Sequence, residues 1–119
     1  MGQLRDDCSG LNGLSAFRKT FAGEIVLPQD PGYDGARAVW NKVFDRRPAV
    51  VARPVGVDGV AAALRFAREQ DLVVAVRCGG HSIPGLSTCD DGIVIDLSSM
   101  RGARVDPERR TARVNGGAL

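Results

Sequence analysis

The sequence predicts an α+β fold built on a strand–helix–strand unit with additional strands after it. Two short apolar runs, 49–52 and 72–76, are rich in valine and are typical of buried strands. Between them, apolar residues recur at helical spacing, at Val60, Ala63, Leu64 and Ala67. Because strand, helix and strand follow one another within about 30 residues, they predict a βαβ unit with parallel strands and a right-handed crossover.

A first helix is predicted between residues 11 and 22. Leu14, Phe17 and Phe21 are spaced three and four apart, which places them on one helix face, and Gly23 ends the pattern. The proline and glycine residues that follow predict a turn-rich linker before the next element.

A second helix is predicted to begin at Asp34, whose side chain is suited to capping it. Its apolar stripe is formed by Ala36, Val39, Trp40 and Val43. A tryptophan can stack on a cofactor ring, but a place on the apolar stripe of an amphipathic helix favours burial in the core. We therefore expect the side chain of Trp40 to be a core residue.

The remaining elements follow from turn residues and apolar runs. Asp58 is the predicted cap of the helix between the two strands. The strand 72–76 carries no polar residue, as is expected of a strand covered on both faces. After it, 93–97 is predicted as a further strand, and 104–115 as a hairpin whose turn contains Pro107.

Composition limits the class of protein. At 119 residues, of which 44% are hydrophobic, the chain suits one modest domain. A net charge of +2 with scattered arginines argues against a nucleic-acid partner, and no segment is long and apolar enough to span a bilayer. Three cysteines are a small and odd number for a disulfide framework. The first residues also lack the apolar region of a signal peptide, so we expect a cytoplasmic protein. Because the chain stops directly after a strand and a glycine pair, 116–117, we also expect a truncated product.

The stretch from Arg77 to Gly85 is the predicted binding loop. Two adjacent glycines, Gly79 and Gly80, follow the second predicted strand and precede His81, the only histidine in the chain. Glycine allows positive φ and lets a ligand approach the main chain, and consecutive N–H groups can form a concavity for phosphate. Arg77 adds a positive charge at the edge of this concavity. Ligands of open α/β sheets bind at the carboxyl ends of parallel strands, so this position favours a cofactor site.

Other interpretations of the loop are open. Ser82 beside His81 suggests a nucleophile, but adjacent side chains rarely point the same way and no nucleophile elbow surrounds this serine. Cys78, His81 and Cys89 have the chemistry of metal ligands, but a second ligand pair is missing. A glycine turn with a surface histidine is the plainest alternative. No Gly-x-Gly-x-x-Gly opens a helix, which disfavours a nicotinamide-binding domain.

Ordered blocks of sequence lie on both sides of this loop. They are 33–41, 47–49, 53–54, 77–82, 92–100, 105–107 and 111–118. Together they resemble the FAD-linked oxidases of the vanillyl-alcohol oxidase superfamily, nearest to the berberine-bridge-enzyme-like group with its PCMH-type FAD-binding domain. The resemblance covers nearly everything from about residue 30 onward. It implies a helical segment at 1–46, followed at 47–119 by the incomplete first lobe of such a domain.

The resemblance implies FAD as the cofactor. In this family the Arg-x-Gly-Gly-His-Ser loop wraps the FAD diphosphate, and the histidine is bonded to the 8α-methyl carbon of the flavin. Carried over, the FAD-binding residues are Arg77, Cys78, Gly79, Gly80, His81, Ser82 and Gly85. His81 is the implied covalent attachment point. The substrate domain and the catalytic base lie further downstream in the family, so no catalytic residue is assigned.

The implied function is the FAD-binding portion of an oxidoreductase. The full-length relatives oxidise an alcohol, a sugar or another small organic substrate and pass electrons to O₂. Two alternatives are an inactive truncated fragment and a non-catalytic nucleotide-binding module, because a fold alone does not determine function.

Overall fold

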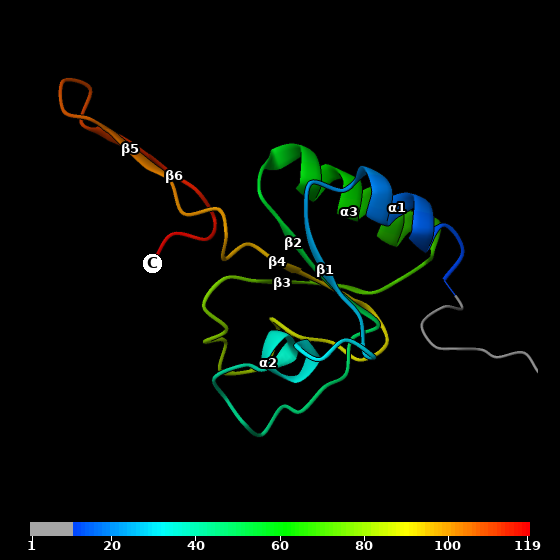
Figure 1. Ribbon diagram of the computed structural model, residues 1–119. Coiled ribbons are helices and arrows are strands. Elements are labelled where there is room, and N and C mark those ends of the chain that lie inside the picture. Colours follow the sequence, from blue (N-terminus) through cyan, green and yellow to red (C-terminus); the bar gives the residue numbers. More distant parts are fainter. Residues whose placement is uncertain (1–10) are drawn as a thin grey trace, which may run out of the picture.

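The computed structural model describes residues 11–119 and contains a four-stranded sheet with helices on both faces (Figure 1). The strands are β1 (Gly23–Val26), β2 (Val50–Pro54), β3 (Val74–Arg77) and β4 (Ile93–Asp96). Their order across the sheet is β1-β2-β4-β3. β1 is antiparallel to β2, whereas β4 is parallel to both of its neighbours. The carboxyl ends of the parallel strands β2, β3 and β4 therefore lie at the same end of the sheet.

The βαβ prediction is confirmed, with β4 inserted between the two strands of the unit. Helix α3 (Val57–Glu69) connects β2 to β3, and β4 hydrogen-bonds to both. The strand predicted to be covered on both faces is instead the sheet edge, where Val74 and Val76 are exposed. The central, fully buried position belongs to β4, because its four residues are buried on both faces.

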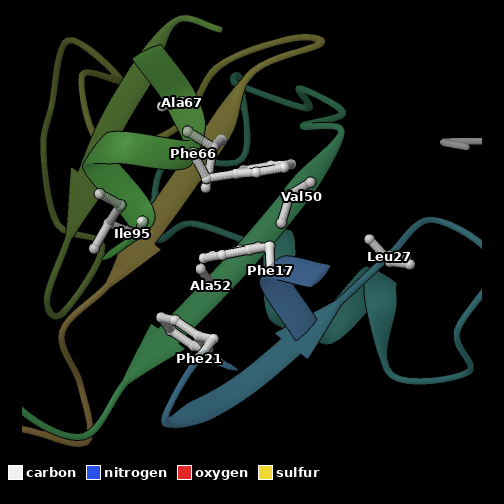
Figure 2. Close-up of a cluster of buried hydrophobic side chains, with 10 residues drawn as sticks. Phe17, Phe21, Leu27, Val50, Ala52, Phe66, Ala67 and Ile95 are labelled. Atoms are coloured by element: carbon white, nitrogen blue, oxygen red, sulfur yellow. The ribbon is translucent and has the colours of Figure 1, made fainter. Parts of the chain in front are cut away.

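The larger core lies between the sheet and the helices α1 (Leu14–Thr20) and α3 (Figure 2). The rings of Phe17 and Phe66 stack with centroids 4.4 Å apart, and Phe21 packs beside them. Each buried aromatic side chain contributes about 1.5–3 kcal/mol by leaving water. These contacts confirm the first predicted helix and its inward face.

Helix α3 differs in detail from its prediction. Its N-cap is Gly56, and Asp58 lies in the first turn without capping it. Leu64 is exposed, whereas Phe66 is buried. The buried face is turned because Gly59 lies against β2, where a Cβ at Gly59 would come within 2.8 Å of the Pro54 side chain. This close approach brings Phe66 rather than Leu64 onto the sheet.

Strand β1 was not predicted from sequence, and it lies inside the segment 1–46 for which only helices were expected. Gly23 opens β1 with φ of 148°, and a Cβ there would lie 2.2 Å from the Arg53 carbonyl oxygen. The glycine that marks the end of α1 therefore also permits close pairing with β2. The proposed boundary between residues 46 and 47 stays a prediction.

The second predicted helix is much shorter than expected. Helix α2 (Tyr33–Arg37) ends where Ala38 becomes extended, so Trp40 and Val43 leave the helix and are 64% and 82% exposed. The expectation that Trp40 is a core residue is wrong. The helix ends there because Arg77 binds the carbonyl oxygens of Ala36 and Ala38, and the Trp40 N–H donates to Gly80.

The predicted hairpin is present as β5 (Ala103–Asp106) and β6 (Thr111–Val114). It projects away from the four-stranded sheet, and the chain then turns back toward the end of β3 (Figure 1). The returning chain packs against Leu97 at Gly117, where a Cβ would lie 1.7 Å from the Leu97 carbonyl oxygen. Among residues 11–119, no helix has both the length and the apolar character needed to cross a bilayer.

Candidate cofactor site

The predicted binding loop leaves the carboxyl end of β3 beside the end of β4. Arg77 ends β3 and lies opposite Asp96, which ends β4. The loop is held on one side by the Trp40 N–H, which donates to the Gly80 carbonyl at 2.9 Å. On the other side, the thiol of Cys78 lies 3.9 Å from the Ala118 carbonyl. Residues distant in sequence therefore meet around this loop.

The backbone of the loop presents free hydrogen-bond donors. Within residues 11–119, no hydrogen bond uses the N–H groups of Gly79, Gly80, His81 or Ser82. Gly80 has φ of 71°, a conformation that favours glycine, and it is packed against the backbone of Val39, 3.6 Å from where its Cβ would be. Consecutive free N–H groups in such a turn suit a phosphate group.

His81 lies at the outer side of this turn and is exposed. Its imidazole folds back toward Gly79, where a Cβ would come within 2.9 Å of the ring carbon Cδ2. The ring centroid lies 6.0 Å from that of Trp40, at an interplanar angle of 42°. The imidazole makes no hydrogen bond to any other described residue, so its nitrogens are free to react or to bind.

Arg77 faces into the fold. Its guanidinium donates to the carbonyl oxygens of Ala36 and Ala38, both at 2.7 Å, and to Asp96 at 3.1 Å. Only 13% of the side chain is exposed. The predicted phosphate contact of Arg77 stays a prediction, because the side chain is occupied in holding the segment before Trp40 against the loop.

Asp96 was missed by the sequence reasoning. Its carboxylate is fully buried and accepts hydrogen bonds from Arg53 and Arg77, both at 3.1 Å. Burial opposes ionisation of this carboxyl group, but the hydrogen bonds from Ser98, the charge of Arg77 and the hydrogen bond from Arg53 outweigh it, so the pKa is lowered. An aspartate that ends an otherwise apolar strand was the available signal.

The charge pairs extend across the whole sheet. Glu24 on β1 pairs with Arg53 on β2, and Arg53, Asp96 and Arg77 continue the alternation across β4 to β3. Each buried charge therefore has an opposite charge beside it. These ion pairs connect the four strands at the end of the sheet from which the loop departs.

The far end of the loop is anchored to residues 41–46. The amide of Asn41 donates to the Ile83 carbonyl, and Arg46 donates to the Gly85 carbonyl, each at 2.9 Å. Gly85 has φ of 75°, and a Cβ there would lie 2.6 Å from the Phe44 ring. Gly85 therefore shapes the loop by close packing, and its direct contact with a cofactor stays a prediction.

The alternative chemistries find little support in the geometry. The hydroxyl of Ser82 accepts a hydrogen bond from the Leu86 N–H at 3.0 Å, as in a local turn. Cys89 is buried, and its burial raises the pKa of the thiol. Within residues 11–119, no three histidine, cysteine or acidic side chains are grouped to hold a metal ion. Neither a serine nucleophile nor a metal centre is therefore assembled by these residues.

Comparison with known proteins connects this geometry to a cofactor. Residues 48–119 match the protein family described as FAD binding domain. The chain belongs to this family. It is 36% identical over 97 residues to (R)-6-hydroxynicotine oxidase of Paenarthrobacter nicotinovorans, an alignment that covers 82% of the chain and 21% of that enzyme.

Solved structures of FAD-binding-domain proteins share the fold. The structure of 6-hydroxy-D-nicotine oxidase from Arthrobacter nicotinovorans gives a TM-score of 0.80 at 32% identity, covering 98% of this chain and 23% of that one. The structure of berberine-bridge-enzyme-like protein number 28 of Arabidopsis thaliana gives a TM-score of 0.72 at 27% identity. The match covers 79% of this chain and 21% of that one. The resemblance and the fold class predicted from sequence are confirmed: this chain matches the FAD binding domain family and shares its fold with these solved structures. It spans about a fifth of the length of these relatives.

The described residues fit FAD on structural grounds. The free N–H groups of residues 79–82 can donate hydrogen bonds to a diphosphate, and Gly79 is exposed where this row begins. The exposed imidazole of His81 stands beside these donors. FAD, when bound, supplies the redox chemistry, while the protein positions it.

Proposed function

We propose that this chain binds FAD through the loop 77–85 and that the flavin is bonded to His81. The observation that carries the proposal is the row of free N–H groups at residues 79–82, adjoining an exposed imidazole at the carboxyl end of β3. A diphosphate would satisfy these donors. A site for phosphate alone has no use for a nucleophile, which is why the histidine favours a flavin nucleotide.

Each predicted residue has a distinct part in this proposal. The N–H groups of Gly79, Gly80 and Ser82 bind the diphosphate, and Cys78 leads the main chain into the turn. Neutral imidazole is nucleophilic near neutral pH, which suits His81 for bonding to carbon. The bond joins an imidazole nitrogen to the flavin 8α-carbon. Forming this bond would remove one hydrogen from the methyl carbon and one proton from the other ring nitrogen, and O₂ would take up the two hydrogens and two electrons as hydrogen peroxide.

Direct attraction between the Arg77 guanidinium and the diphosphate contributes less in this binding mode than the loop sequence suggests. The guanidinium of Arg77 is paired with Asp96 and with two carbonyl oxygens. The diphosphate charge is therefore met mainly by N–H dipoles, and Arg77 keeps those dipoles in place.

The larger protein implied by the family would be an oxidoreductase. We propose that it oxidises an alcohol, a sugar or another small organic molecule and passes the electrons to O₂. The relative with 36% identity is named as an oxidase of 6-hydroxynicotine, which supports a small organic substrate without specifying it.

The covalent bond is tested by the mass of the denatured protein. The protein, expressed with FAD, is unfolded in acid, and its intact mass is compared with that of His81→Ala. We expect the wild-type protein to carry the mass of one bonded FAD and the variant to release FAD freely. A wild-type protein found only at the mass of the bare polypeptide would overturn the bond to His81.

A non-catalytic nucleotide-binding module is the second candidate. It is favoured by the same free N–H groups, because FAD shares its diphosphate with other dinucleotides. Equal affinity for ADP-ribose and for FAD, together with an unmodified His81, would support this second function.

A further inference from the structure

We infer that Trp40 is a flavin-binding residue whose indole packs against the ring system of the flavin held at His81. This inference rests on the proposed function, since it concerns the same cofactor. It adds a residue from a separate segment, which the glycine loop does not include.

The first observation is the exposure of Trp40. Its side chain is 64% exposed, although the preceding residue Val39 is buried. Trp40 is the only tryptophan in the chain. Burying such a large aromatic side chain contributes about 1.5–3 kcal/mol, so an indole exposed beside the binding loop can stabilise a ligand that covers it.

The second observation is that Trp40 is held in place. Its N–H donates to the Gly80 carbonyl at 2.9 Å, and Arg77 holds the carbonyl oxygen of Ala38 two residues earlier at 2.7 Å. Val39 packs against Gly80, since a Cβ at Gly80 would lie in van der Waals contact with the Val39 Cα, at 3.6 Å. The contacts that place the indole are therefore those that shape the phosphate-binding turn.

The third observation is the distance to the proposed attachment point. The indole and imidazole centroids are 6.0 Å apart with an interplanar angle of 42°. Aromatic rings interact favourably with centroids about 4.5–7 Å apart. A flavin bonded to the imidazole would be attached to a ring that already lies within this distance of the indole. The electron-poor ring system of the flavin is a suitable partner for an electron-rich indole.

The test follows the resonances of the isotope-labelled chain during titration with FAD or with ADP-ribose. ADP-ribose has the same diphosphate and adenosine but no flavin. We expect both ligands to shift the amide resonances of Gly79 and Gly80. The single indole N–H resonance of Trp40 should shift with FAD and stay in place with ADP-ribose.

Variants then measure the contribution of the indole. Trp40→Ala should weaken FAD binding about two- to tenfold and leave ADP-ribose binding unchanged, since only the flavin loses a partner. Trp40→Phe should restore part of the affinity. Val43→Ala is the matched control, because Val43 is 82% exposed on the same segment, and it should bind both ligands like the wild type.

The outcomes separate the two proposals. If FAD shifts Gly79 and Gly80 while the indole resonance does not move and Trp40→Ala keeps its FAD affinity, the role of Trp40 is overturned and the FAD site stands. If Trp40→Ala weakens both ligands equally, Trp40 acts only on the shape of the turn and the flavin contact is wrong. If neither ligand shifts the glycine resonances, the proposed function fails, and the role of Trp40 with it.

Discussion

The carboxylate of Asp96 lies 3.1 Å from the guanidinium of Arg77, where the paired strands β4 and β3 end. The carboxylate is fully buried, and the same guanidinium holds two carbonyl oxygens of the segment that leads to Trp40. One buried ion pair therefore connects the centre of the sheet with both segments of the candidate site.

Asp96→Asn should destabilise the fold by about 3 kcal/mol, because it leaves the charges of Arg53 and Arg77 poorly compensated in a partly buried setting. Urea unfolding of the chain measures this change. Asp45→Asn is the control, since it removes an exposed carboxylate that also pairs with an arginine, and it should change stability little. Equal effects of the two substitutions would contradict the structural role of Asp96.

The stability of the chain should decrease in acid. The folded-state pKa of Asp96 lies below its ordinary value of 3.8. Its contribution is therefore fully present above pH 3.8 and is lost as the pH falls through the lower folded-state value. Urea midpoints recorded across this range should fall less steeply for Asp96→Asn than for the wild type, and parallel curves would show that other groups dominate.

Gly85→Ala should destabilise the chain by about 2 kcal/mol, since the new Cβ meets the Phe44 ring and the residue must keep a positive φ. Gly35→Ala is the matched control. Gly35 lies in α2 with open space around it, so alanine there should be neutral or slightly stabilising. Thermal unfolding of the two variants measures the difference, and a Gly85→Ala protein as stable as the wild type would show that the loop adapts.

Thiol labelling should distinguish Cys78 from Cys89. Cys89 is buried and its thiol pKa is raised by burial, whereas Cys78 is partly exposed. An alkylating reagent applied to the folded chain should modify Cys78 well before Cys89, as measured by peptide mass. If Cys89 were labelled at the same rate in the folded and in the unfolded protein, its burial would be contradicted.

Local patterns explain why much of the fold was predictable. The aromatic residues of α1, the apolar strands β2 and β4 and the turn of the β5–β6 hairpin all lie where periodicity and turn residues predict them. Strand β1 escaped prediction because its few residues form a strand only through pairing with β2. The position of β3 escaped as well, since an apolar run does not state which strand lies at the edge.

The candidate site divides in the same way. The glycine pair and His81 are adjacent in sequence, so a phosphate-binding loop could be predicted from residue types, while the bond from His81 to flavin was implied only by the family resemblance. Trp40 and Asp96 could not be added, because they reach the site from other segments. The helical spacing around Trp40 even predicted burial, and it was overruled by the hydrogen bonds from Arg77 and from the Trp40 N–H.

The family resemblance implied the cofactor, whereas the residue pattern by itself determined the βαβ unit and the loop at the end of its second strand. These features depend on neighbouring residues, whose spacing and side-chain chemistry are contained in the chain order. Only the tertiary structure decided that Arg77 is used within the fold, that Asp96 is its buried partner and that Trp40 stands exposed beside His81. Such relationships depend on which distant groups satisfy one another's charges and hydrogen bonds, and only packing in three dimensions selects them.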